Sequence, residues 1–225
     1  HVHICNFVDL MIKNEMETAQ SVVDRYISDG CSAPNIVLEL LCKSAQLLGE
    51  QWCSDETTFA DVTIGLAGLH QILRRLDRLL SKELVSTNDS QSILLLNMPG
   101  DTHIFGLSVL ETFFRNSGWT VESHFEMNPA ELVDRVSRVS FDVVGFSVAC
   151  DEHVDACNLL IKEVRKNSLN NKLGIMAGGS AFIRNEHLKQ KITADVVADD
   201  AVDALQTALT VCSGGQLNKT KVDHV

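Results

Sequence analysis

Apolar residues in the first third of the chain recur at helical spacing. This holds for residues 4–13, 15–28 and 58–82, and for the segment that follows Ser32 as far as Trp52. In the segment 58–82 the apolar positions are Phe59, Val62, Leu66, Leu69, Leu73, Leu76 and Leu80. Steps that alternate between three and four are typical of a helix that packs in a bundle. Residues 1–82 are therefore predicted to form an antiparallel four-helix bundle.

From residue 92 the pattern changes to short apolar runs separated by helical segments. The strand-like runs are 92–98, 120–125, 142–148, 173–177 and 195–198. The helical segments are 106–117, 129–139, 153–166, 182–191 and 200–212. Strands that alternate with helices predict a parallel sheet covered on both faces.

Residues 92–213 are accordingly expected to form a flavodoxin-like or Rossmann-like, doubly wound α/β domain with five parallel strands. The mostly polar residues 83–91 are interpreted as the linker between the bundle and this domain. Residues 214–225 are interpreted as a frayed tail.

Charge and composition exclude several classes of function. The 225 residues include 19 basic and 30 acidic side chains, which gives a net charge of −11. So acidic a chain is not expected to bind nucleic acid directly, and a protein partner with a basic surface suits it better. No apolar run reaches the roughly 18 residues of a membrane helix, and no signal peptide is recognisable, so we expect a cytoplasmic protein without a membrane anchor.

The chain has seven cysteines and no C-x-x-C pair. They are Cys5, Cys31, Cys42, Cys53, Cys150, Cys157 and Cys212. Most lie in apolar periodic segments, which favours reduced thiols in the core of a cytosolic protein. A zinc site or a disulfide framework is the alternative.

The segment after the first predicted strand carries the clearest candidate for chemistry. It runs from Pro99 to Gly106 and includes His103, a possible metal ligand. Asp101 stands two residues earlier and could accept the other ring N–H, which fixes the tautomer of a ligating histidine. Gly106 would let a bulky ligand approach the backbone. The alternative is an ordinary surface-loop histidine near a helix N-terminus.

Two later strands end in residues that belong to the same edge of the predicted sheet. Ser147 lies at the end of the third strand, and Gly178 and Gly179 follow the fourth. The carboxyl ends of parallel strands meet at one edge, where doubly wound folds bind their ligands. Together these positions predict one crevice.

The order and spacing of these residues resemble the cobalamin-binding domain. The matching residues are Asp101-x-His103-x-x-Gly106, Ser147-x-Ala149 and Gly178-Gly179, against the signature D-x-H-x-x-G, S-x-L and G-G. Ala149 replaces the usual Leu. The helical bundle resembles the cap that precedes this domain in methionine synthase and in light-sensing MerR-type repressors.

The resemblance implies that His103 is the lower axial ligand of cobalt, in place of dimethylbenzimidazole, with Asp101 and then Ser147 in a hydrogen-bond relay behind it. Gly106, Ser147, Gly178 and Gly179 would lie along the buried nucleotide tail. The implied cofactor site consists of Trp52, Val62, Asp101, Thr102, His103, Ile104, Phe105, Gly106, Ser147, Val148, Ala149, Gly178 and Gly179.

The cap has one informative departure from the family pattern. The family motif is Trp, nine residues and then Glu-His, and counting from Trp52 leads to Val62 and Thr63 instead. The resemblance therefore implies a hydroxo, aquo or methyl form of cobalamin in preference to the adenosyl form. Trp52 would cover the upper face of the corrin; its alternative role is in the core of the bundle.

A narrower resemblance concerns residues 48–52 and 59–66, which are similar to the AerR, PpaA and AppA type photosynthesis antirepressors of purple bacteria. It implies a light- or redox-responsive regulator that is not itself an enzyme and acts through a transcriptional repressor protein. Three alternatives stay open. They are a haem-binding redox sensor on the same fold, a corrinoid shuttle protein of a methyltransferase system, and a signalling module without a cofactor.

Overall fold

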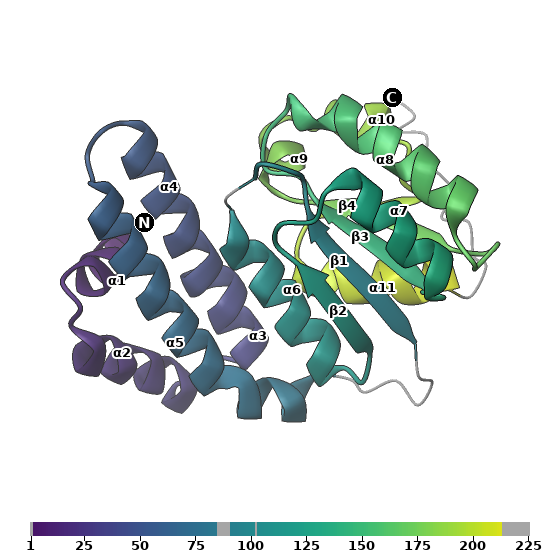
Figure 1. The fold of residues 1–225 in the computed structure, drawn as a ribbon. Helices are drawn as coiled ribbons and strands as arrows, with labels where there is room; N and C mark the ends of the chain where they lie inside the picture. Colours follow the sequence, from purple (N-terminus) through teal and green to yellow (C-terminus); the bar gives the residue numbers. More distant parts are fainter. Residues whose placement is uncertain (1, 85–90, 102, 213–225) are drawn as a thin grey trace, which may run out of the picture. The chain divides into compact units, whose positions relative to one another are not determined.

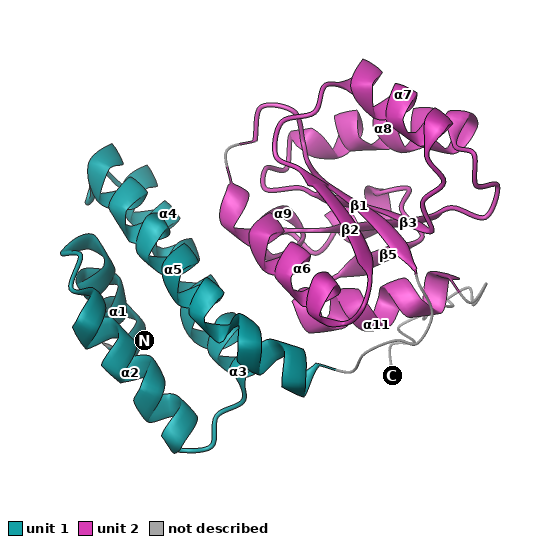
Figure 2. Ribbon diagram, turned by 60° about the horizontal axis from the view of Figure 1, so that its bottom comes forward, with its two compact units in different colours: residues 1–86 teal, residues 87–225 magenta. Residues whose placement is uncertain are grey.

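The computed structural model describes residues 2–84, 91–101 and 103–212. The chain divides into two compact units, His1–Ser86 and Thr87–Val225 (Figure 2). Of the predicted linker 83–91, residues 85–90 lie outside the described residues, as does the predicted tail 214–225. Each unit is described by itself below.

The first unit is helical, as the apolar spacing predicts. Its elements are α1 (Val2–Ile12), α2 (Met16–Ser28), α3 (Ala33–Ile36), the π-helical segment η1 (Val37–Cys42), α4 (Lys43–Cys53) and α5 (Phe59–Glu83) (Figure 1). Ser32 caps α3 by accepting a hydrogen bond from the Asn35 N–H at 3.3 Å. Thr58 and Asp61 form a reciprocal capping box at the start of α5. The α3, η1 and α4 segments follow one another without a break, so the predicted third helix is one rod with a π-helical centre.

The first half of α5 packs through glycines instead of the predicted large apolar side chains. Gly65 and Gly68 are buried, whereas Phe59 is 74% exposed. A Cβ atom would lie 2.9 Å from a Leu48 methyl carbon at Gly65 and 2.8 Å from the Met11 sulfur at Gly68. The glycines therefore permit a close approach of neighbouring side chains that a bulkier residue would prevent.

The second unit contains the predicted five-stranded, all-parallel sheet. Its strands are β1 (Ser92–Asn97), β2 (Thr120–His124), β3 (Val143–Ser147), β4 (Gly174–Gly178) and β5 (Val196–Ala198). Their order is β2-β1-β3-β4-β5, so the chain reverses its direction of winding between β1 and β3. This arrangement confirms the predicted doubly wound fold.

Helices cover both faces of this sheet. They are α6 (Ile104–Asn116), α7 (Pro129–Arg138), α8 (His153–Asn167), α9 (Ser180–Arg184), α10 (Leu188–Lys191) and α11 (Ala201–Cys212). Helices α7 and α8 lie on one face and α6 and α11 on the other (Figure 1). Leu94, Val144, Phe146 and Ile175 from the strands join one core with side chains of α7 and α8.

One helix prediction in this unit is wrong. The segment 182–191, predicted as one helix, forms the short helices α9 and α10 with a break at residues 185–187. Asn185 leaves the helical region at φ −137° and ψ 89°. Its side-chain amide donates a hydrogen bond to Asp151 Oδ2 at 3.1 Å. This tertiary contact holds the chain out of the helix that its apolar spacing favours.

Two glycine substitutions test the packing of the helical unit. Gly49 in α4 has open space around an added Cβ, so Gly49→Ala should raise the free energy of unfolding by up to about 1 kcal/mol through helix propensity. Gly68→Val should lower it by about 1–3 kcal/mol through overpacking against Met11. Urea denaturation followed by circular dichroism measures both. Equal effects of the two variants would contradict this account of α5.

Candidate cofactor site

Three strands end side by side at the carboxyl edge of the sheet. Asn97, the last residue of β1, pairs in register with Ser147 at the end of β3. Ser147 in turn pairs with Gly178 at the end of β4. The three sequence motifs thus follow neighbouring strands at one edge, beside the reversal between β1 and β3. This is the place where doubly wound sheets bind ligands.

Asp101 and His103 form a close pair in the loop between β1 and α6. Asp101 Oδ1 lies 2.5 Å from His103 Nδ1 and also accepts the His103 backbone N–H at 2.9 Å. The Asp101 side chain is 1% exposed, whereas that of His103 is 59% exposed. A carboxylate at Nδ1 keeps the proton on that nitrogen. The other nitrogen, Nε2, is then free to act as a ligand.

The second Asp101 oxygen joins this loop to the end of β3. Oδ2 accepts the backbone N–H of Ala149 at 3.2 Å. Ser147 is half-buried, and in the described part of the chain its hydroxyl is not a hydrogen-bond partner of Asp101. The relay behind His103 therefore runs from Asp101 to a backbone amide and not to the serine that the resemblance implies.

The charges of the pair support each other. Burial acts to raise the pKa of Asp101, but the side-chain and backbone hydrogen bonds from His103, its charge and the Ala149 N–H outweigh burial and lower that pKa. The hydrogen bond to Asp101 raises the pKa of His103 above 6.5, against the effect of burial, with a further increase from the Asp101 charge and a decrease from Arg184. The geometry thus favours a carboxylate paired with an imidazole N–H.

The glycines of the site play two different parts. Gly179 has φ +116°, and a Cβ there would lie 2.4 Å from the Val148 carbonyl oxygen. At Gly178 a Cβ would lie 3.1 Å from the Ala198 carbonyl oxygen. Contacts within the protein therefore explain why both positions carry a glycine. A Cβ at Gly106, in contrast, would meet no atom of the described residues within 4 Å apart from its chain neighbours and the backbone of its own helix, so Gly106 borders open space beside His103.

The other predicted site residues differ in their surroundings. Ile104 is exposed next to His103, whereas the Phe105 side chain is buried. Val148 and Ala149 are buried between the β1–α6 loop and the Gly178-Gly179 turn. Thr102 lies outside the described residues.

The two predicted residues of the cap belong to the helical unit. Trp52, near the end of α4, is 46% exposed, so it is not part of the bundle core. Val62, on the first turn of α5, is half-buried. The exposed indole is a large apolar surface on the helical unit.

Residues that the sequence reasoning missed complete the site. Asn97 is 3% exposed, and its Oδ1 has no hydrogen-bond partner among the described residues. Ser180 and Arg184 of α9 both donate to the Ala149 carbonyl oxygen, at 3.1 Å and 2.5 Å. A polar Asn at the end of an apolar strand was a visible signal. Arg184 gave none, since it lies within the segment predicted as a regular helix.

The cysteines do not follow the predicted core pattern. Among the described residues none of the seven forms a disulfide; only Cys157 is buried, and Cys31 and Cys53 are exposed. Burial raises the pKa of Cys157 to about 12, which makes it unreactive. In the described ranges no group of three or more His, Cys, Asp or Glu side chains could hold a metal ion. No helix among these residues has the length and apolar character needed to cross a membrane.

The fold and this edge define a class of cofactor-binding α/β domains that offer a carboxylate-oriented histidine. The family model described as the B12 binding domain matches residues 91–209, more than half of the chain. The protein belongs to the B12-binding domain family.

Related proteins extend this finding. An uncharacterized 20.5 kDa protein in the bchF-crtJ intergenic region of Rhodobacter capsulatus is 25% identical over 158 residues, which make up 70% of this chain and 82% of that protein. The similarity to this protein is consistent with the predicted resemblance to the AerR-type group.

Two solved structures share the fold. The monomethylamine corrinoid protein of Methanosarcina barkeri superposes with a TM-score of 0.74 at 15% identity, over 92% of this chain and 96% of that chain. A cobalamin-binding protein from Desulfitobacterium hafniense DCB-2 has a TM-score of 0.50 at 21% identity, over 94% and 99%. Both matches span the helical unit as well as the α/β unit.

The Asp101–His103 pair should contribute to stability in a defined pH window. The contribution of His103, whose pKa is raised, is present below 6.5 and is lost as pH rises through its folded value. That of Asp101, whose pKa is lowered, is present above 3.8 and is lost as pH falls. Asp101→Asn should therefore cost more stability near pH ~5.5 than near pH ~8.5, by roughly 0.5–1 kcal/mol given the solvent screening at His103.

Urea unfolding at the two pH values measures this difference. In a His103→Gln background, Asp101→Asn should cost the same at both pH values, because no imidazole charge remains. If Asp101→Asn lowers the free energy of unfolding equally at both pH values while His103 is intact, the charged pair does not stabilise the fold.

Proposed function

We propose that the protein binds cobalamin with His103 as the lower axial ligand and acts as a light- or redox-responsive transcriptional regulator through a protein partner. The observation that carries the binding part is the Asp101–His103 pair at the carboxyl edge of a B12-binding domain. The imidazole is oriented by a buried carboxylate and leaves Nε2 unblocked, which suits a soft or borderline metal ion.

Three features of the site fit a corrinoid. The histidine supplies one nitrogen donor, as axial ligation requires. Gly106 leaves open space next to it, so a large planar group meets no side chain at that position. Asn97 adds a buried carbonyl oxygen without a partner in the described residues, which can accept a hydrogen bond from a ligand.

The helical unit supports a role in sensing. Trp52 and Phe59 are exposed aromatic side chains at the end of α4 and the start of α5. In the proposed function Trp52 covers the upper face of the corrin. Val62 and Thr63 offer no carboxylate or imidazole to hold an adenosyl group, so we propose a hydroxo, aquo or methyl form. When bound, cobalamin supplies a cobalt ion whose upper ligand changes with light or redox state. In the proposed function such a change would alter the contacts of Trp52 and would thereby shift the equilibrium between two conformations of the protein.

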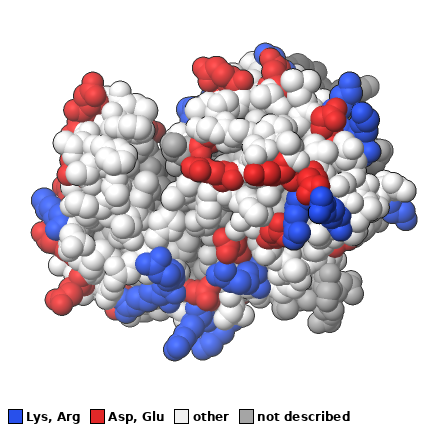
Figure 3. Space-filling view, viewed as in Figure 1, with Lys and Arg blue, Asp and Glu red and all other residues white. Residues whose placement is uncertain are grey.

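The regulatory part rests on the relatives and on charge. The Rhodobacter relative is encoded between bchF and crtJ, and residues 48–52 and 59–66 are similar to photosynthesis antirepressors. With a net charge of −11, the chain is suited to a protein partner and not to DNA; we propose a transcriptional repressor. Figure 3 shows that on the visible face the basic side chains gather in separate clusters among acidic and uncharged ones.

An absorption titration of the full chain tests the proposal. Hydroxocobalamin and, separately, haemin are added in darkness and after illumination. We expect stoichiometric corrinoid binding with a spectrum that changes in His103→Ala, because the variant loses the axial nitrogen. Asp101→Asn should retain binding with weakened histidine ligation, by about one order of magnitude, in line with the loss of a residue that orients a metal ligand.

The alternatives give different results. A Soret shift with haemin and no change with corrinoids would identify a haem sensor. Methyl transfer from protein-bound methylcobalamin to a thiol, catalysed by a partner enzyme, would identify a shuttle protein. A corrinoid spectrum that is identical in the parent protein and in His103→Ala would exclude His103 as the ligand.

Gly106 separates binding from folding. A Cβ added at this position of α6 meets no side chain of the described residues, so Gly106→Val should fold normally. Its melting temperature should equal or exceed that of the parent protein, since glycine is a poor helix former. The added side chain should nevertheless reduce corrinoid affinity by at least about tenfold, because it occupies space that the ligand needs. Gly49→Ala is the control for helix stabilisation. Unchanged affinity in Gly106→Val would place the ligand elsewhere.

A further inference from the structure

The backbone segment Val148–Ala149 is held from three directions. The Val148 N–H donates to the Gly178 carbonyl oxygen at 2.8 Å. The Ala149 N–H donates to Asp101 Oδ2 at 3.2 Å. The Ala149 carbonyl oxygen accepts from α9, through Ser180 and Arg184. One short segment therefore connects the carboxylate behind His103 with the turn that carries the two glycines.

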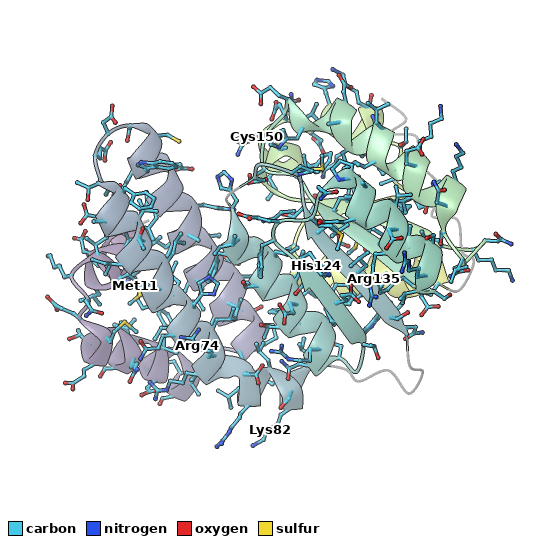
Figure 4. The ribbon with its side chains drawn as sticks, viewed as in Figure 1. Met11, Arg74, Lys82, His124, Arg135 and Cys150 are labelled. Carbon is cyan, nitrogen blue, oxygen red and sulfur yellow. The ribbon has the colours of Figure 1, made fainter. Side chains whose placement is uncertain are left out.

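Arg184 is the charged member of this set. It is the last residue of α9, and its Nη2 lies 2.5 Å from the Ala149 oxygen and 3.8 Å from Asp151 Oδ1. Figure 4 labels Cys150, the residue between these two contacts, in the loop beside α9. A guanidinium donates a stronger hydrogen bond than a hydroxyl does, so Arg184 should contribute more than Ser180 to holding the Ala149 carbonyl.

The Ala149 carbonyl and the Ala149 N–H belong to two adjacent, planar peptide groups that meet at the Ala149 Cα atom, so a hydrogen bond that holds the carbonyl also restricts the N–H. The N–H fixes Asp101 Oδ2, and the other oxygen of this carboxylate meets His103 Nδ1 at 2.5 Å. Arg184 thus lies at the far end of a continuous series of contacts that begins at the imidazole. It is also close enough for its charge to lower the pKa of His103.

The Arg184 side chain contributes little to the packing of the core. Its side chain is 58% exposed, and the neighbouring α9 residues Ala181 and Phe182 supply the buried packing of this short helix. Loss of the guanidinium should leave the fold intact and disturb mainly the loop that it holds.

We propose that Arg184 is a positioning residue for the axial histidine. It holds Ala149 so that the Ala149 N–H fixes the Asp101 carboxylate, which in turn orients His103. The cobalt-dependent part of this inference rests on the proposed function; the part that concerns Ala149 and Asp101 does not.

The first test uses the protein without cofactor. Amide hydrogen exchange is measured by NMR for Arg184→Met, Arg184→Lys and the control Arg138→Met. Arg138 is an exposed arginine whose ion-pair partner in the described part of the chain is Asp134 of its own helix, so the control makes the same change of charge. We expect the Ala149 amide to exchange about tenfold faster in Arg184→Met, corresponding to the loss of a charge-assisted hydrogen bond. The exchange rate of the Val148 amide, which donates a hydrogen bond to the Gly178 carbonyl oxygen, should be unchanged.

The second test reads the cobalt ligand itself. The full chain is labelled with ¹⁵N-histidine, loaded with hydroxocobalamin and reduced to the cobalt(II) state. In the electron paramagnetic resonance spectrum, ligation by a labelled histidine splits each line into a doublet, whereas ligation by the unlabelled nucleotide base gives a triplet. We expect Arg184→Met to lower the ratio of histidine-ligated to base-ligated cobalt by about tenfold. Arg184→Lys should stay nearer to the parent ratio.

The outcomes separate this inference from the proposed function. If the parent protein binds no corrinoid, the proposed function fails, and amide exchange alone decides the role of Arg184. Parent-like exchange at Ala149 in Arg184→Met would overturn the inference. If the parent protein ligates cobalt through His103, an equal histidine-ligated fraction in Arg184→Met and Arg138→Met would overturn the inference too. If Arg184→Met does not fold, Ser180→Ala removes the second donor to the same carbonyl and should shift both readouts in the same direction, by less.

Discussion

The close approach of the β4–α9 turn to Val148 is the constraint on which the site depends. Gly179 can approach the Val148 backbone only because it has no Cβ and adopts a positive φ. This contact sets the place of α9, and α9 in turn holds the Ala149 carbonyl. Ala149 then fixes Asp101, so three loops that are distant in sequence form one hydrogen-bonded edge around the histidine.

The sequence predicts the parts of the molecule that repeat or that a motif marks. Alternation of strands and helices suffices for the parallel sheet, because buried strands read as apolar runs. Asp101 and His103 were recognisable because a ligating histidine needs a second polar partner nearby. Arg184 was not recognisable, because its role arises from where α9 lies and not from local spacing. The same holds for the break at Asn185, which depends on Asp151.

The helical unit shows a further limit of apolar spacing as a guide. Large apolar side chains such as Phe59 fit the predicted period of α5, yet Gly65 and Gly68 form the packed surface there. Close packing of helices is set by shape as well as by hydrophobicity. The exposed aromatic residues that result give this unit the apolar surface that the proposed function assigns to cofactor contact.

The π-helical segment η1 also decides which way the end of α4 faces. A π turn accommodates one more residue than an α turn, so side chains beyond it are rotated by about 100° relative to an unbroken α-helix. Leu48, which fills the space over Gly65, and Trp52 both lie beyond η1. Deletion of a single residue within Val37–Cys42 would therefore rotate all of α4 about the helix axis. It would turn Leu48 away from Gly65 and redirect the indole of Trp52 without altering either residue.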